Sequence, residues 1–222
     1  MQDTREIPGA RIPRFSGRIS GLHPMDEIQR LSPLEAIRHR PELYVRPDEP
    51  DTVPDQLLQA SLCHPLAELQ CGSASRLHIS ISGLSAVITD DGPGWPVHRI
   101  HDGRRFAESL LGDLYACRDH KQHAELAKSL CRITLPVVVA LSECFTLDIL
   151  RDGEHWRQVY RNGNAEAPLS CIGSCRTSGT RLSFVLDQRF CDGAVFSAEA
   201  LSVWLAALPP EVPGDGITVH AS

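Results

Sequence analysis

Two hairpin-type turns divide the last third of the 222-residue sequence into short strands. Asp152-Gly153 and Asn162-Gly163 are dipeptides of the kind that closes a two-residue β-hairpin loop, because both positions tolerate a positive φ. A meander of this kind needs a second layer to cover its apolar face. The apolar and β-branched segments around the turns predict strands at residues 145–150, 156–160, 169–172 and 180–186.

Helices for that second layer are expected mainly in the first half of the sequence. Ser32 stands three residues before Glu35, which is the spacing of a capping box at a helix start. Between residues 77 and 88, apolar and polar residues alternate and predict two strands. The sequence therefore predicts an α+β two-layer sandwich, a mixed β-sheet with helices on one face. The expected helices cover residues 33–40, 55–69, 106–115, 122–141 and 197–208, with Pro65 bending the second and Pro136 interrupting the fourth.

The composition is that of an ordinary folded domain. Hydrophobic residues make up 42% and charged residues 23%, which argues against a disordered chain. The length gives room for a core without disulfides or metal. A formal net charge of −6 provides no general attraction for nucleic acid, so DNA contact is expected only locally or through a partner.

No segment of the sequence is typical of a membrane span. The longest apolar run, residues 135–141, is far shorter than the roughly 20 residues that cross a bilayer. The first 20 residues are polar where a signal peptide would be apolar. We therefore expect a cytoplasmic protein without a membrane partner, whose eight cysteines are reduced thiols.

The chain divides into three parts by its composition. Residues 1–25 are rich in Gly, Pro and Arg without apolar periodicity, and we expect a flexible N-terminal arm. Residues 26–210 carry all the expected helices and strands and form one domain. Residues 211–222 are expected to form a C-terminal tail.

A short acidic and glycine-rich motif follows the second expected strand. Asp90 precedes Gly92 and Gly94. Glycines let the backbone approach a flat ligand closely, and a buried carboxylate at a strand end can accept a hydrogen bond from an exocyclic amine. Asp-Gly pairs also form ordinary turns after strands. By itself the motif leaves a ligand site and a simple turn both open.

Several segments resemble, in order, the motifs of one ATPase family. Residues 34–45 (LEAIRHRPELYV) resemble its leader LEAVRKRPxMYIG, and residues 90–96 (DDGPGWP) resemble its adenine-binding element DDGRGIP. Residues 138–143 (VVALSE) resemble VVNALSE, and residues 177–184 (TSGTRLSF) resemble KTGTxVRF. These motifs are those of the N-terminal GHKL ATPase domain of gyrase B and topoisomerase IV B, in the type IIA topoisomerase family. The resemblance implies the GHKL, or Bergerat-type, fold in a truncated and degenerate form.

The same resemblance implies an adenine pocket. On the family pattern, Asp90 would bind the adenine amine, Gly92 and Gly94 would line the base pocket, and Thr180 would help to hold the base through its hydroxyl and bound water. Without this role, Asp90 is a turn residue and Thr180 an ordinary strand residue. The implied ligand is ATP or ADP, bound weakly, and the implied partner is a second copy or another protein chain.

The family's catalytic residues are missing at the matching positions. Counting back without gaps from Asp90, the catalytic glutamate falls on Gln59 and the magnesium-binding asparagine on Cys63. A glutamine cannot act as a general base, and a thiol is a poor ligand for a hard cation, so neither ATP hydrolysis nor Mg²⁺ is expected. The glycine-rich lid motifs correspond to residues 116–120 and 129–134, which contain no glycine to cradle phosphates.

Three functions stay open, and we favour the first. It is a gyrase B-like module that binds nucleotide or a protein partner without ATP hydrolysis; the length of the chain, which matches only the first subdomain of the family, also points this way. The second is an ATP-hydrolysing fragment of a DNA topoisomerase that acts with partner chains. The third is a zinc-stabilised interaction domain, because Cys117, His120, His123 and Cys131 have spacings that can close around Zn²⁺.

Overall fold

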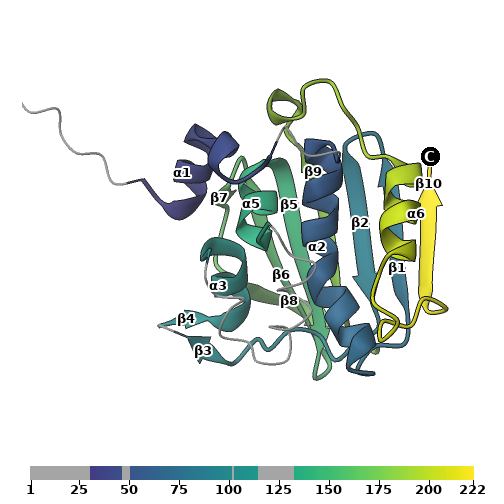
Figure 1. Ribbon diagram of the computed structural model, residues 1–222. Helices are drawn as coiled ribbons and strands as arrows, with labels where there is room; N and C mark the ends of the chain where they lie inside the picture. The colour runs from purple at the N-terminus through teal and green to yellow at the C-terminus, as the bar shows by residue number, and fades with distance from the viewer. Residues whose placement is uncertain (1–30, 47–50, 102, 115–132) are drawn as a thin grey trace, which may run out of the picture. The chain divides into compact units, whose positions relative to one another are not determined.

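An eight-stranded mixed sheet is the central element of the fold (Figure 1). The computed structural model describes residues 31–46, 51–101, 103–114 and 133–222. The strand order is β10-β1-β2-β9-β5-β6-β7, and β8 also pairs with β6. Only β1 and β10 pair in parallel among the described strands of this sheet. The strands are β1 (Leu77–Ser82), β2 (Ser85–Asp90), β5 (Ser142–Arg151), β6 (Glu154–Arg161), β7 (Asn164–Ala165), β8 (Ser170–Ser174), β9 (Gly179–Leu186) and β10 (Ile217–Ala221), with β3 (Ile100–His101) and β4 (Arg104–Arg105) paired separately.

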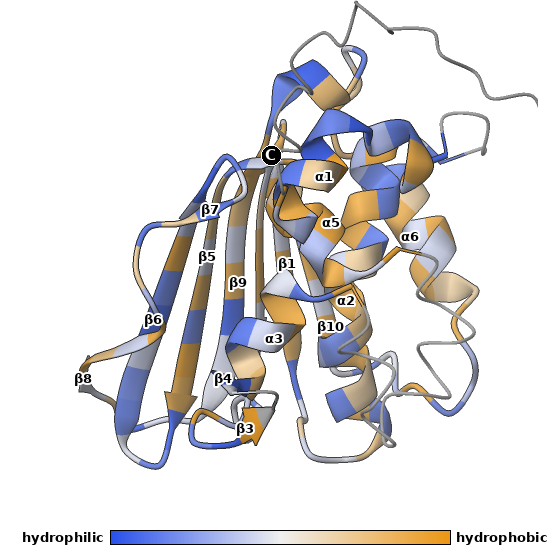
Figure 2. Cartoon of the chain, turned by 90° about the vertical axis from the view of Figure 1, so that its left-hand side faces the viewer, coloured by the Kyte–Doolittle hydropathy of each residue, from blue (hydrophilic) through white to orange (hydrophobic). Residues whose placement is uncertain are grey.

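The helices all lie on one face of this sheet (Figure 2). In β1, Leu77, Ile79 and Ile81 are buried and alternate with exposed polar residues, so one face of the strand packs into the core. The α+β fold with a mixed sheet and helices on one face is thereby confirmed. No helix within the described ranges is long and apolar enough to span a membrane. The helices are α1 (Pro33–His39), α2 (Val53–Gln70), α3 (Phe106–Gly112), α5 (Leu135–Ala140) and α6 (Ala198–Ala206), with short 3₁₀ turns η1 (Pro41–Leu43) and η3 (Gln188–Phe190).

Local capping and turn signals are confirmed where the structure describes them. Ser32 accepts from the backbone of Glu35, whose carboxylate in turn accepts from the backbone of Ser32, and α1 begins directly after this capping box. The hairpin of β5 and β6 closes at Asp152-Gly153 with φ of 55° and 83°. Asn162-Gly163 ends β6 with φ of 49° and 77°.

Pro136 lies at a helix position that differs from the expected one. The sequence predicts that Pro136 interrupts a helix over residues 122–141, but α5 begins at Leu135 and the proline lies in its first turn. The missing N–H costs nothing there, because the first-turn amides have no partner within the helix. The rest of that expected helix lies outside the described residues. Pro65 lies inside α2, which the structure assigns as one helix from Val53 to Gln70.

The segment expected to be a C-terminal tail contains a strand of the sheet. Residues 217–221 form β10, which pairs in parallel with β1 from Leu77 opposite Ile217 to Ile81 opposite Ala221. The sheet therefore extends into residues 211–222, beyond the expected domain boundary at residue 210. The expected arm, residues 1–25, lies outside the described part of the chain.

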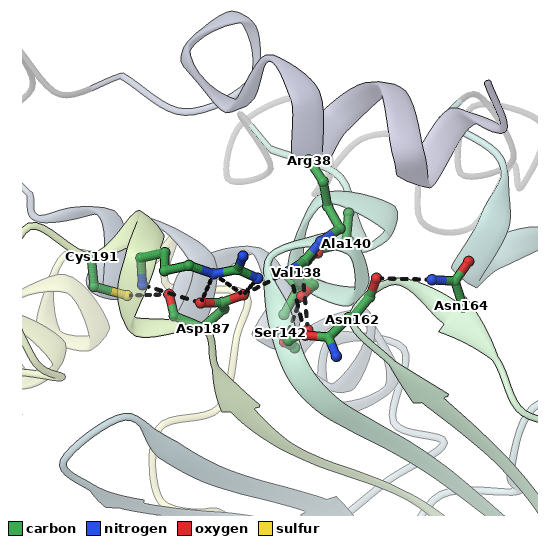
Figure 3. Close-up of polar contacts among 9 residues, drawn as sticks. Arg38, Val138, Ala140, Ser142, Asn162, Asn164, Asp187 and Cys191 are labelled. Carbon is green, nitrogen blue, oxygen red and sulfur yellow. Dashed lines mark hydrogen bonds and ion pairs between the residues drawn. The ribbon is translucent and has the colours of Figure 1, made fainter. Parts of the chain in front are cut away.

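Arg38 joins α1 to the ends of α5, β5 and β9 (Figure 3). Its guanidinium donates to the carbonyl oxygens of Ala140 and Ser142 and to Asp187 Oδ2, the last at 2.6 Å. The Asp187 side chain is 3% exposed and also accepts from Arg189. Hydrogen bonds from Arg189, and then from Arg38, outweigh the effect of burial and hold the pKa of Asp187 well below its usual range.

Candidate functional site

The carboxyl group of Asp90 connects the ends of two neighbouring strands. Asp90 is the last residue of β2, and it is 5% exposed. Its Oδ1 accepts from the backbone N–H of Gly92 at 2.9 Å and from that of Thr180, near the start of β9, at 3.3 Å. The structure therefore brings together three of the residues that the sequence assigns to one site.

The surroundings of Asp90 favour its neutral form. Burial raises the pKa of Asp90 to about 6, although the two backbone donors act in the opposite direction. The nearby carboxylates of Glu68 and Asp91 add to the increase. Asp90 therefore changes its protonation state close to neutral pH, where a solvated aspartate would be fully ionised.

Glycines allow three backbone segments to approach one another beside Asp90. Gly94 has a φ of +73°, and a Cβ at this position would lie 2.7 Å from the carbonyl oxygen of Leu150. Gly179 has a φ of +149°, and its Cβ would overlap the carbonyl oxygen of Asp90. No side chain larger than hydrogen fits these two positions as they stand. Backbone segments therefore pack tightly against one another beside Asp90.

Asp91 fixes the loop in which the motif lies. Its carboxylate accepts from the backbone and hydroxyl of Ser75, both at 2.7 Å, and from the backbone and Nε of Arg76, at 2.8 and 3.1 Å. Burial alone would raise the pKa of Asp91, but these hydrogen bonds outweigh it and hold the pKa far below its usual range. The loop after β2 is thus anchored to the start of β1.

A cavity of about 380 Å³ lies next to the motif, between it and α2. Its wall includes Gly94, Trp95 and, from α2, His64, whose ring centroid lies 5.1 Å from that of Trp95. Arg151, at the end of β5, also lines the cavity and donates to the carbonyl oxygen of Gly94 at 2.7 Å. Asp90 is not part of the described wall, and neither are Gly92 and Thr180. Of the four residues predicted for the site, only Gly94 borders this cavity.

Gln59 and Cys63, the two α2 residues that the resemblance predicts at the catalytic positions, offer no ligand suited to magnesium. Gln59 donates its side-chain amide to Asp51 Oδ2 at 3.0 Å, so its amide is engaged as a donor. Cys63 is disulfide-bonded, so the expectation that all cysteines are reduced thiols is wrong for this residue. A disulfide sulfur is neutral and is no ligand for a cation that prefers oxygen. The free cysteines in the described ranges are Cys71, Cys144, Cys171, Cys175 and Cys191.

The zinc hypothesis concerns residues that the structure does not describe. Its four candidates, Cys117, His120, His123 and Cys131, all lie outside the described ranges. Among the described residues, no group of three or more His, Cys, Asp or Glu side chains could hold a metal ion. Most of the two segments that match the family's lid also lie outside the described ranges.

Three residues of the site are not among the four that the sequence analysis assigns to it: Asp91, Arg151 and Gly179. The sequence around Asp91 does not indicate which groups its carboxylate would accept hydrogen bonds from. Gly179 meets the motif through the pairing of β9 with β2, and Arg151 meets it through the contact of β5 with the loop after β2. Position within a matched segment is the one available signal for Gly179, which directly precedes Thr180.

Comparison with known proteins gives relatives among the B subunits of bacterial topoisomerases, although no protein-family model matches the chain. The B subunit of DNA topoisomerase 4 from Escherichia coli is 30% identical over 199 residues, which are 87% of this chain and 31% of the relative. The B subunit of DNA gyrase from Clostridium acetobutylicum is 26% identical over 190 residues, or 84% of this chain and 30% of the relative. The chain thus spans about a third of the length of these relatives.

A solved structure shares the fold. The 43K ATPase domain of Thermus thermophilus gyrase B, solved in complex with an aminocoumarin, aligns with a TM-score of 0.67 at 24% identity. The alignment covers 85% of this chain and 48% of that domain. The chain is therefore a homologue of the B subunits of DNA topoisomerase 4 and DNA gyrase, and it has the fold of the gyrase B ATPase domain.

Proposed function

We propose that this protein is a gyrase B-like module that binds the base of an adenine nucleotide beside Asp90 and does not hydrolyse ATP. The observation that carries the proposal is the buried Asp90 carboxyl, whose Oδ1 is held by Gly92 and Thr180. A carboxylate fixed in this way offers its other oxygen to an exocyclic amine. The tight backbone packing at Gly94 and Gly179 supports the proposal, because it fixes the position of Asp90 at the end of its strand.

The absence of hydrolysis rests on different residues. Gln59 cannot accept a proton from an attacking water, and Cys63 supplies no oxygen ligand for Mg²⁺ in either its thiol or its disulfide form. The residues present therefore fit an adenine but do not fit a magnesium ion. We place the protein in the cytoplasm, where Cys63 would meet a reducing environment, and expect it to reach DNA only through a partner chain.

Adenosine, ADP and ATP are expected to bind within about tenfold of one another, or about 1.4 kcal/mol. The reason is that the contacts offered by Asp90 and its neighbours reach the base and not the phosphates. A thermal-shift titration measures the three affinities, because a ligand of the folded state raises the free energy of unfolding by RT ln(1 + [L]/Kd). The variant Asp90→Asn should weaken all three ligands alike, whereas Asp215→Asn, at an exposed position, should leave them unchanged. A strong preference for ATP would contradict the proposal.

No magnesium-dependent ATP turnover above a heat-killed control is expected, and the double substitution Gln59→Glu with Cys63→Asn should not restore it. Phosphoryl transfer depends on positioning and on charge stabilisation around the phosphates, and residues 116–120 and 129–134 contain no glycine for that purpose. Phosphate release at saturating Mg-ATP measures turnover by the unmodified chain and by the double variant, and circular dichroism checks that both are folded. Turnover on the order of one per second would refute the expectation.

The second candidate function is that of an ATP-hydrolysing part of a DNA topoisomerase that acts with partner chains. It is favoured by the similarity of this chain to the B subunit of DNA topoisomerase 4. The same phosphate-release assay separates the two candidates. Hydrolysis by the unmodified chain, alone or with added partner, would favour the second.

A further inference from the structure

The two oxygens of the Asp90 carboxyl differ in their hydrogen bonding. Oδ1 accepts from the backbone of Gly92 and Thr180. No described residue forms a hydrogen bond with Oδ2. Oδ2 is also not one of the buried side-chain atoms that lack a partner, so it keeps accessible surface. Because Oδ1 is engaged by two donors, a proton added to this carboxyl resides on Oδ2.

The charged groups around Asp90 leave it without a counter-ion. Glu68 on α2 and Asp91 in the loop after β2 are both acidic and disfavour the carboxylate. Arg76, before β1, is engaged by Asp91, and Arg151, at the end of β5, by Asp152 and the Gly94 carbonyl. Among the described residues, Asp90 has no ion pair, and burial brings its pKa to about 6. The ionised and the neutral forms are therefore both accessible close to neutral pH.

We propose that Asp90 accepts from the 6-amino group of a purine as a carboxylate and donates from Oδ2 to the 6-oxo group of a purine as a carboxylic acid. The base preference of the site then changes from adenine in neutral solution to hypoxanthine in mildly acidic solution. The hydrogen-bonding capacity of the two forms supports this change of preference. An ionised carboxylate only accepts hydrogen bonds, whereas the neutral acid has one O–H donor. A buried carboxylic acid kept neutral as a donor is an established use of such a group. The inference rests on the proposed function, since it concerns the same site.

The experiment compares adenosine with inosine, whose bases differ in the 6-substituent and the adjoining ring nitrogen. Isothermal titrations at about pH 5, 6 and 7 should show adenosine affinity falling about tenfold from pH 7 to pH 5, and inosine affinity rising about tenfold. His64, which lines the neighbouring cavity, provides the control for a contribution from another side chain. The variant His64→Gln should therefore keep both profiles. The variant Asp90→Asn should flatten them, because an amide does not titrate in this range.

Each outcome bears on the proposal separately from the proposed function. If adenosine binds at pH 7 and the ratio of the two affinities is the same at pH 5, the inference is wrong while the adenine site stands. If the profiles follow His64 and persist in Asp90→Asn, the inference is also wrong. If neither nucleoside binds at any pH to protein that circular dichroism shows to be folded, the adenine site and the inference both fall.

Discussion

Replacing Gly179 with alanine is expected to destabilise the folded chain by more than about 3 kcal/mol and to abolish purine binding. The added Cβ would overlap the carbonyl oxygen of Asp90, and the φ of +149° is one that an L-residue rarely adopts. The backbone has little freedom to move away, because Gly179 pairs with Leu150 at the start of β9, which lies between β2 and β5. Relief would have to come from displacing the residue on which the proposed site depends.

Gly153→Ala is the matched control for this experiment. Gly153 also has a positive φ, of +83°, but no neighbouring atom lies within 4 Å of a Cβ built there. The free energy of unfolding of Gly153→Ala should therefore fall only by the cost of placing an alanine at a positive φ, about 1 kcal/mol. Urea unfolding measures both variants, and the slope of each transition shows whether they remain comparable. Equal losses in the two variants would mean that overlap with Asp90 is not the cause.

The substitution Asp187→Ala is expected to lower the free energy of unfolding by about 3 to 5 kcal/mol. The physical reason is that it leaves the guanidinium of Arg38, whose side chain is 14% exposed, without its carboxylate partner. Arg161→Ala serves as the control, because the pair of Arg161 with Glu166 lies at the surface, with side chains 61% and 46% exposed. That change should cost less than about 1 kcal/mol. Similar losses from the two substitutions would contradict this account of Arg38.

The contribution of Asp187 also has a defined pH dependence. Its pKa in the folded protein lies below the unfolded value of about 4, so the folded state binds its proton less readily. The stabilisation is therefore complete above about pH 5 and is lost as the pH falls through 4 toward the folded value. The difference in stability between wild type and Asp187→Ala should shrink over that acidic range. A constant difference would show that the ion pair is not its source.

The features that the sequence predicts well are set by neighbouring residues. The capping box at Ser32 and the turn at Asp152-Gly153 depend on a few consecutive residues, and both are confirmed. Asp90, Gly92 and Thr180 lie together in the structure, as the sequence predicts. That prediction comes from the family resemblance and not from residue spacing alone. Whether they bind a purine stays a prediction.

The features that the sequence does not reveal depend mostly on residues far apart in the chain. β10 has only five residues and follows a segment rich in Pro and Gly, so nothing local distinguishes it from a tail. The close approach of Gly179 to Asp90 arises only when β9 pairs with its neighbours. An apolar run does not show where a helix starts, so Pro136 resembles a break although α5 begins one residue before it. Prediction of the fold from the sequence is therefore limited more by strand pairing between distant residues than by weak local preferences for helix or strand.

The parallel pairing of β1 with β10 has a consequence for synthesis on the ribosome. Leu77 leaves the ribosome long before its partner Ile217. The edge of β1 that pairs with β10 therefore stays unpaired while the intervening chain is translated. At about 5 to 20 residues per second, that delay is on the order of ten seconds. During it, an uncharged strand of alternating Leu or Ile with Ser and His presents unpaired amides and carbonyls. Nascent chains should thus be most prone to mispairing at β1, and a chaperone that shields this strand would matter more during translation than afterwards.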